Sequence, residues 1–373
     1  MNEDKATRYH RLRRRASILG AGLGALVLLL LLVTGASAAM RDFAYARAGG
    51  LFTLTVVLYV GLVALITEAV QVPLAFHLGV TLERRFGLST ETTARWWWDH
   101  VKVAAIGLLF ATTAAVLVCW LIRWSPERWW IAAAAAFSAV TIGLAQLAPV
   151  VLLPLFYELE PLDRPALSER LVALANRAGA PVLGVFEWRL GDRTRKANAA
   201  LTGLGRTRRI IVSDTLLADH SDDEIEVILA HELAHHVHGD IWRGIALEMA
   251  VLMAGLFAAD LAIGAAAGRF GITAKWDPAA LPLVVLAGGA VSLALTPLAN
   301  ALSRAHERRA DRYALATTGN VPAFTSAMKR LGAQNLAEER PSRLVEWLFY
   351  THPPVAARIE LAEAWSSSQK RPS

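Results

Sequence analysis

Six runs of apolar residues along the chain are long enough to cross a lipid bilayer as helices. They extend over residues 17–38, 51–80, 103–122, 129–156, 241–267 and 279–302. A helix needs about 20 mostly apolar residues to span the hydrocarbon layer, because each residue adds about 1.5 Å. The pattern predicts a mostly α-helical, polytopic membrane protein with six transmembrane helices. The count rises to seven if the more polar helix predicted at 222–240 is also embedded, facing a water-filled cavity.

Between the fourth and fifth runs, the pattern changes to that of a small α/β domain. Residues 168–178 have helical periodicity, Pro181 ends that helix, and residues 182–190 and 209–213 are predicted as strands. Residues 196–204 are predicted as an edge strand. The free N–H and C=O groups of such a strand can pair with an extended substrate.

The same pattern divides the chain into three parts. Residues 1–16 form a basic N-terminus, and residues 17–156 form a membrane domain with four spans. The remaining part, residues 157–373, contains the α/β domain with the helix at 222–240, the last two spans, and C-terminal helices over 303–373.

Composition and charge support a membrane protein. Hydrophobic residues make up 55% of the chain, charged residues make up 19%, and the mean hydropathy is +0.39. The net charge of +6 does not indicate nucleic-acid binding, because the basic residues are spread over loops instead of one soluble face. They suit attraction to the anionic headgroups of a lipid bilayer. The single cysteine, Cys119, lies in an apolar run and excludes an internal disulfide.

Basic residues also predict the orientation in the membrane. The N-terminus carries Lys5, Arg8, Arg11, Arg13, Arg14 and Arg15. The positive-inside rule therefore places it in the cytoplasm, and we interpret the first apolar run as an anchor that is not cleaved. Six spans return the helix at 222–240 and the C-terminal residues to the cytoplasmic side. The Arg-rich and Ala-rich composition is typical of a GC-rich bacterial genome, so the expected location is a bacterial inner membrane.

The run HELAHHVHGD carries the chemistry of a metal site. His231, Glu232 and His235 form an H-E-x-x-H arrangement. Two histidines four residues apart share one helix face and can bind one zinc ion. Glu232 lies about 100° away around the helix, where it can take a proton from a zinc-bound water. Ser221 and Glu224 form a capping-box pattern that predicts the start of this helix.

A catalytic zinc site needs a third ligand, and the segment NALSRAHERRADRYA offers one. Glu307 and Asp311 are one helical turn apart, so one carboxylate can bind zinc while the other orients a ligand imidazole. His306 is the alternative ligand, but it points about 100° away from Glu307. The interleaved acids and arginines also suit a solvated helix face. His236 and His238 face away from the predicted site.

The combination of HExxH with NxxSRxxExxAD, at residues 231–235 and 300–311, resembles a family of integral-membrane gluzincin proteases. This family contains the type I CAAX prenyl protease and the HtpX-like heat-shock proteases. Further matching segments are KANAALTGLGRTRRIIVSDTLL, THPPVAARIELA and LERRFGLSTET. The last resembles a cytosolic loop that HtpX-like chains lack. The resemblance covers residues from about 50 to 362 and favours the CAAX-protease branch.

The expected activity is that of a zinc metalloendopeptidase with one Zn²⁺ per chain, which hydrolyses peptide bonds with a zinc-activated water. The ligands are His231, His235 and Glu307, while Glu232 is the general base. Asp311 is expected to orient a ligand histidine.

The resemblance also implies roles outside the metal ligands. It implies that His352 adds a donor to the developing oxyanion, and that Asn198, Asn300 and Arg358 contact the substrate. From the residues alone, His352 before two prolines also suits a helix cap, and Asn198 suits a turn.

The resemblance implies that the substrate is a polypeptide, prenylated or membrane-embedded, and that the chain trims the C-termini of prenylated proteins. The alternative is an HtpX-like protease that degrades or trims membrane proteins. A third hypothesis is a non-enzymatic membrane scaffold with a structural zinc site. Such sites are closed by four protein ligands and are usually rich in cysteine, whereas this chain offers three ligands without cysteine and a spare glutamate.

Overall fold

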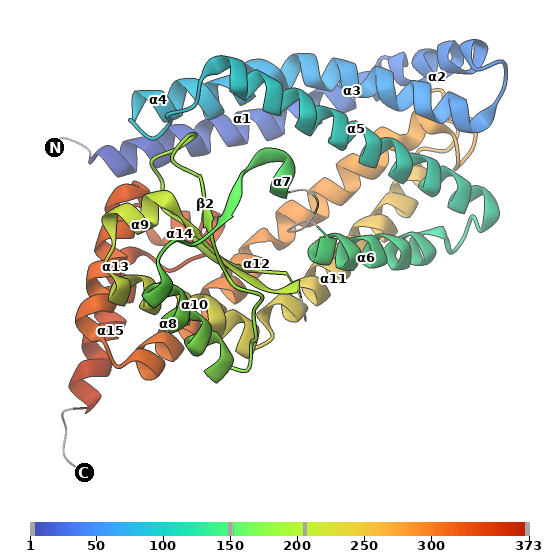
Figure 1. Ribbon diagram of the computed structural model, residues 1–373. Helices are drawn as coiled ribbons and strands as arrows, with labels where there is room; N and C mark the ends of the chain where they lie inside the picture. Colours follow the sequence, from blue (N-terminus) through green and yellow to red (C-terminus); the bar gives the residue numbers. More distant parts are fainter. Residues whose placement is uncertain (1–3, 148–150, 152, 204–206, 370–373) are drawn as a thin grey trace.

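The computed structural model describes residues 4–147, 151, 153–203 and 207–369. Long helices dominate these residues, and one small sheet lies at one end of them (Figure 1). Five segments are long and apolar enough to cross a membrane. They are α1 (Lys5–Val33), α3 with its continuation (Phe52–Arg85), α5 (Thr93–Trp124), α11 (Asp240–Ala265) and η4 with α12 (Pro278–Thr318). The prediction of a mostly helical protein with several membrane spans is confirmed.

The bounds of all six predicted spans differ from those of the observed helices, and two of these spans are interrupted. The first run crosses a break at Gly35, whose φ of +75° ends α1, and the short helix α2 (Ala36–Arg47) follows. The run at 129–156 is divided into α6 (Trp129–Leu147) and α7 (Leu153–Phe156), and residues 148–150 and 152 lie outside the described residues. The apolar part of α6 is shorter than the five candidate spans, so among the described residues the structure has five such spans where six were predicted.

The predicted basic N-terminus is helical and continuous with the first span. α1 begins at Lys5, so it runs through the predicted boundary at residue 16 without interruption. α3 (Phe52–Phe76) likewise continues through a π-helical turn, η1 (His77–Leu82), into α4 (Glu83–Arg85). These extensions carry polar residues beyond the apolar spans and toward the sheet (Figure 1).

α11 and α12 (Leu281–Thr318) form the helical pair that leads into the sheet-containing domain. A Cβ atom added at Gly255 of α11 would lie 3.2 Å from the Cα of Gly288 in α12. The small residues therefore allow the two helices to approach closely. The apolar half of α12 packs in the membrane bundle, and its polar C-terminal half enters the domain, where it packs against α10 (Asp222–Val237).

The sheet has four strands in the order β1-β2-β4-β3. The strands are β1 (Leu159–Pro161), β2 (Val185–Trp188), β3 (Ala199–Thr202) and β4 (Arg209–Ser213). β2 pairs with β4 in parallel, and the other pairs are antiparallel. β3 lies at the edge as predicted, although it is shorter than residues 196–204, of which 204 is outside the described residues. β4 has the predicted bounds, while β1 was not predicted.

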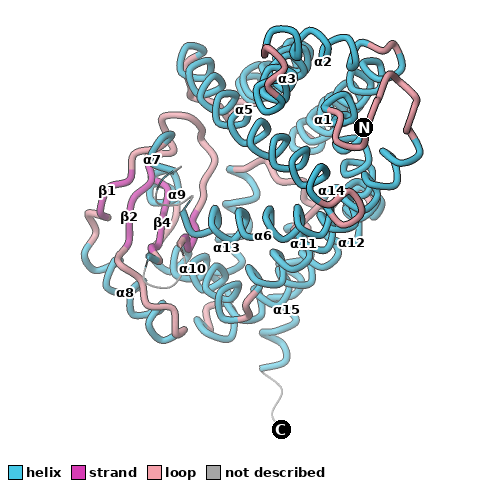
Figure 2. The backbone as a smooth tube through the Cα atoms, turned by 90° about the vertical axis from the view of Figure 1, so that its right-hand side faces the viewer, coloured by secondary structure: helices cyan, strands magenta, loops and turns pink. Residues whose placement is uncertain are grey.

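Short helices follow or pack beside the sheet, and most of them contribute to a separate hydrophobic core (Figure 2). They are α8 (Pro165–Arg177), α9 (Asp214–Asp219), α13 (Val321–Gln334), α14 (Arg343–Phe349) and α15 (Val355–Gln369). Leu171 of α8, Ile210 of β4 and Phe324 of α13 are completely buried in this core together with the apolar face of α10. The core therefore holds α10 firmly between the sheet and α12.

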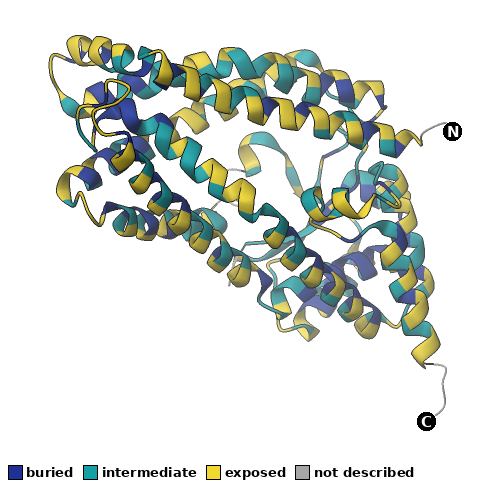
Figure 3. Ribbon diagram, turned by 180° about the vertical axis from the view of Figure 1, so that it is seen from behind, coloured by how far each residue is buried: buried dark blue, intermediate teal, exposed yellow. Residues whose placement is uncertain are grey.

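Burial differs between the sheet-containing domain and the long apolar helices. Figure 3 shows buried residues concentrated around the sheet, whereas the outer faces of the long helices are exposed. Large apolar side chains such as Leu29, Leu65, Leu109 and Leu293 are among the exposed ones. Exposed leucines at these positions are expected for helices whose outer faces contact lipid.

Candidate active site

α10 begins and ends at defined capping residues. The Ser221 hydroxyl accepts a hydrogen bond from the backbone N–H of Glu224, and the Glu224 carboxylate accepts one from Ser221 N–H at 2.8 Å. This is the predicted capping box. The helix ends at Val237, earlier than predicted, because Gly239 adopts a φ of +66°. Asp240 then starts α11 in a new direction.

Two helices bring the predicted metal ligands together. His231 and His235 of α10 and Glu307 of α12 each offer one donor atom, and these atoms lie within 4.8 Å of one another. The Nε2 atom of His231 is 3.2 Å from Glu307 Oε2, and that of His235 is 3.4 Å from Glu307 Oε1. His231 and Glu307 are buried. The arrangement therefore places two imidazoles and one carboxylate around a shared point.

The donor group fits a zinc ion. Ligand atoms held about 2.0–2.1 Å from tetrahedral zinc lie about 3.3 Å apart, which matches the nitrogen-to-oxygen distances in this group. Glu307 Oε2 is also buried and has no partner with hydrogen-bond geometry among the described residues, although His231 Nε2 lies 3.2 Å away. A buried carboxylate oxygen of this kind needs a cation or a donor. Three donors without cysteine leave the fourth position open, as in catalytic zinc sites.

A carboxylate contacts the other ring nitrogen of each ligand histidine. The Nδ1 atom of His231 lies 2.9 Å from Asp311 Oδ1. The Nδ1 atom of His235 lies 3.0 Å from Asp240 Oδ2. Such contacts fix the ring orientation and leave Nε2 free for a metal. Asp311 lies where the sequence predicts a histidine partner, but Asp240 was missed. In the sequence, only the Gly-Asp pair after the motif pointed to Asp240. Its position near His235 depends on the turn at Gly239.

Asp240 is itself surrounded by basic groups. It forms an ion pair with Arg309, and its Oδ1 atom lies 3.6 Å from Arg243 and 3.8 Å from His306 Nδ1. His306, the alternative ligand, is therefore on the outer side of His235. Within the part of the chain that the structure describes, the metal-binding group contains Glu307 and not His306.

Burial and charge shift the pKa values of several groups on α10, among them Glu232 and His235. Burial raises the pKa of the Glu232 carboxyl above its usual value, and the two neighbouring histidines lower it by less. A raised pKa brings this carboxylate closer to the range in which it can exchange protons near neutral pH. Burial lowers the pKa of His235, but hydrogen bonds to Glu307 and Asp240 outweigh it and raise the pKa to about 9. The carboxylates of Glu307 and Asp240 thus favour a positive charge at the His235 ring.

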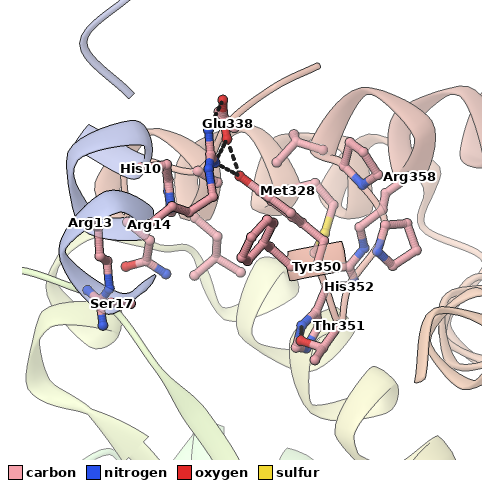
Figure 4. Close-up of a pocket in the computed structure, with 18 residues that line it drawn as sticks. His10, Arg13, Arg14, Ser17, Met328, Glu338, Tyr350, Thr351, His352 and Arg358 are labelled. Carbon is pink, nitrogen blue, oxygen red and sulfur yellow. Dashed lines mark hydrogen bonds and ion pairs between the residues drawn. The ribbon is translucent and has the colours of Figure 1, made fainter. Parts of the chain in front are cut away.

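His352 lies beside the ligand group. Its Nε2 atom is 3.3 Å from Glu307 Oε1, and its side chain is 61% exposed. The Thr351 hydroxyl lies 2.9 Å from Nδ1 of the same ring. The turn between α14 and α15 therefore presents His352 at the open side of Glu307. A pocket of about 530 Å³ adjoins it, lined by residues of this turn, of α13 and of α1 (Figure 4).

The three residues predicted to contact substrate have different surroundings. Asn198 is exposed immediately before β3, and its backbone N–H donates to the Ser213 hydroxyl at 3.0 Å. Asn300 is buried, and its side chain donates to the Leu348 carbonyl at 2.8 Å, which links α12 to α14. Arg358 donates to Asp311 Oδ2 at 2.9 Å. Their contact with substrate stays a prediction.

The other histidines of the motif are outside the ligand group. His238 lies 2.8 Å from the Ala234 carbonyl through Nδ1, and its ring packs edge-on against Tyr313. His236 belongs to the last turn of α10. The contacts of His238 agree with the prediction that it faces away from the predicted site.

Comparison with known proteins covers nearly the whole chain. Residues 161–366 match the model of peptidase family M48, and residues 2–158 match that of the CAAX prenyl protease N-terminal domain, described as five membrane helices. The chain is 30% identical to the uncharacterized metalloprotease YhfN of Bacillus subtilis (strain 168), over 96% of this chain and 84% of the relative. It is 26% identical to CAAX prenyl protease 1 of Saccharomyces cerevisiae, over 84% and 73%.

A solved structure shares the fold. The crystal structure of S. mikatae Ste24p superposes with a TM-score of 0.83 at 22% identity, and the match covers 96% of this chain and 87% of that one. The two family matches confirm the predicted multi-pass membrane architecture and zinc-dependent proteolysis, and the substrate is a polypeptide. The matched N-terminal domain supports the CAAX-protease branch over the HtpX-like one. The chain belongs to peptidase family M48 and is an integral-membrane zinc metalloprotease with the N-terminal domain of the CAAX prenyl proteases.

Proposed function

We propose that this protease cleaves peptide bonds near the C-termini of prenylated proteins, at the cytoplasmic face of a bacterial inner membrane. The observation that carries the proposal is the group of His231, His235 and Glu307 at the end of the membrane bundle. The name of the yeast relative, CAAX prenyl protease 1, supports the substrate class. The long apolar helices support a substrate that arrives from the bilayer.

In this proposal, His231, His235 and Glu307 hold the zinc ion. When bound, zinc acidifies a water molecule and polarises the scissile carbonyl. Glu232, one residue after the first ligand, takes a proton from the attacking water and passes it to the leaving amine. Asp311 and Asp240 keep the two imidazoles oriented through their Nδ1 atoms.

We assign the oxyanion donor to His352. Its ring is next to Glu307 but is largely exposed, so its Nε2 atom is accessible to a carbonyl oxygen beside the metal. The extended substrate pairs with the free edge of β3, to which the exposed Asn198 leads. For Asn300 and Arg358, the bonds to Leu348 and Asp311 favour roles in holding α12, α14 and α15 together.

The contacts of α1 support the proposed orientation. His10 lies 2.9 Å from the Leu336 carbonyl, and Arg14 pairs with Glu338, so the N-terminal end of α1 meets the C-terminal domain directly. The N-terminus and the metal site are thus on one side of the membrane. The basic residues of α1 favour the cytoplasm for that side.

The substrate proposal is tested by comparing wild type and Glu232→Gln, both loaded with zinc. The substrates are a farnesylated CAAX peptide, its unprenylated twin and an unfolded membrane protein. We expect wild type to cleave the farnesylated peptide best, and the variant to retain zinc but lose at least about a hundredfold in rate. Equal cleavage by the variant would refute the role of Glu232. A preference for the unfolded protein would support the HtpX-like alternative.

Orientation is tested separately with a cysteine probe. In a Cys119→Ser background, Ser368→Cys places one thiol at an exposed position near the end of α15. A membrane-impermeant maleimide should label it only after the cells are broken. Labelling of spheroplasts with intact inner membranes would place the domain on the opposite side.

A further inference from the structure

The N-terminal segment of α1 is linked to the active-site turn by a half-buried polar cluster. Arg14 contacts both carboxylate oxygens of Glu338, at 2.5 and 3.5 Å. The Tyr350 hydroxyl donates a hydrogen bond to the same carboxylate (Figure 4). The side chain of Glu338 is only 5% exposed, so Arg14 and Tyr350 take the place of water at its carboxylate. The cluster joins α1 to Tyr350, which is two residues before His352.

Tyr350 is also held from the opposite side. Arg304 donates hydrogen bonds to the carbonyl of Tyr350 at 2.6 Å and to that of Glu346 at 2.9 Å. Arg304 is on α12, one turn before the metal ligand Glu307. The hydroxyl end of Tyr350 is therefore fixed by α1 and its backbone by the metal-binding helix.

Only one residue separates Tyr350 from His352 of the active site. His352 follows two residues later, and Pro353 and Pro354 come directly after it. Proline fixes its own φ and restricts the residue before it, so a shift of Tyr350 is passed on to His352. The imidazole borders an open pocket of about 530 Å³. Packing on that side does not restrain the ring, so its position depends on the backbone of the turn and on its contacts with Glu307 and Thr351.

A strained residue lies in the same region. Leu336 has a φ of +50°, a conformation that is costly for a leucine and persists where the surroundings impose it. Its carbonyl contacts His10, and its side chain packs against the cluster that contains Tyr9. The neighbouring Asn335 accepts a hydrogen bond from Ala197 N–H at 3.0 Å, next to the proposed substrate strand. His10 of α1 therefore contacts the residue next to Asn335, which in turn contacts the segment before β3.

We infer that Arg14, Glu338 and Tyr350 are positioning residues of the proteolytic step, which act by holding His352 beside Glu307. The inference rests on the proposed role of His352 as oxyanion donor. A misplaced donor affects the transition state more than the binding of substrate. Loss of a cluster contact should therefore lower kcat and leave KM nearly unchanged.

The test compares Tyr350→Phe and Arg14→Gln with the matched control Arg15→Gln in the full-length, zinc-loaded protein. Arg15 is the exposed neighbour of Arg14, so both variants remove the same charge from the same helix. We expect kcat to fall about tenfold in the first two variants, with KM and zinc content within about twofold of wild type. Arg15→Gln should behave as wild type. Arg14→Lys should restore part of the rate, because it keeps the charge beside Glu338.

A double-mutant cycle separates positioning from general loss of structure. In a His352→Ala background, Tyr350→Phe should change kcat by less than about twofold, because the group that Tyr350 positions is already absent. Full additivity of the two changes would overturn the inference, as would an unchanged kcat in Tyr350→Phe alone. If His352→Ala itself has wild-type kcat, the proposed role of His352 fails first. A slow His352→Ala with a normal Tyr350→Phe refutes only the positioning.

Discussion

Replacing Asp240 with asparagine should weaken zinc binding without unfolding the protein. The carboxylate of Asp240 lies 3.0 Å from His235 Nδ1 and also pairs with Arg309. Its side chain is 7% exposed, so water cannot replace it easily. Asparagine keeps the size and one acceptor oxygen, but it removes the negative charge and turns an amide toward a cation. The contact that orients the His235 ring toward the metal is then weakened, because a neutral amide replaces the carboxylate.

The expected loss of zinc affinity follows from the change at the His235 contact. Loss of an outer carboxylate from a metal-bound histidine typically weakens metal affinity about 10- to 100-fold, or about 1.4–2.7 kcal/mol. The effect on folding should be smaller. The Arg309 side chain is 33% exposed and can be solvated once its partner is neutral.

The assay is a zinc competition titration with a chelator, together with thermal unfolding of the metal-free protein. Asp42→Asn is the matched control, because Asp42 is an exposed acid whose ion pair with Arg41 is far from the ligand histidines in sequence and structure. A zinc Kd for Asp240→Asn within about twofold of wild type would refute the reasoning, provided that Asp42→Asn also binds normally.

Further predictions concern the third ligand, the core, the helix cap and the lone thiol. Glu307→Gln should lose at least about tenfold in zinc affinity in the same titration, whereas His306→Gln should not; the opposite order would reassign the ligand. Phe324→Ala, in a completely buried position, should lower the free energy of unfolding by about 3–5 kcal/mol in a denaturant titration, and a loss under 1 kcal/mol would contradict the packing. Ser221→Ala should cost about 1 kcal/mol in the same assay through loss of the cap, and no change would argue against the capping box. Cys119 is buried and should react with a maleimide only after unfolding; rapid labelling of the native protein would contradict its burial.

The local features of this protein follow from sequence patterns with short range. The H-E-x-x-H spacing, the capping box at Ser221 and the strand at 209–213 each depend on residues a few positions apart, and each is present as predicted. The apolar runs predicted most membrane helices for the same reason. Their ends were less predictable, because a single left-handed glycine such as Gly35 ends a helix that composition alone would continue.

The candidate site depends on contacts that no local pattern contains. Asp240 reaches His235 only because Gly239 redirects the chain, and a continuous helix would place a residue at this spacing on another face. From the sequence, the N-terminal segment of α1 was predicted only as a basic N-terminus. Its contacts with Glu338 and Leu336 join positions more than 300 residues apart.

The sequence by itself determined the class of this protein: a bundle of apolar helices, a zinc-binding helix with its general base, and a downstream carboxylate to complete the ligands. These properties follow from helical periodicity, hydropathy and ligand chemistry, which are local. Only the tertiary structure decided that Glu307 and not His306 faces the two histidines, that Asp240 orients one of them, and that Tyr350 connects α1 with the turn of His352. The physical reason is that side chains from separate helices meet only after their apolar faces have packed and set the rotation of each helix.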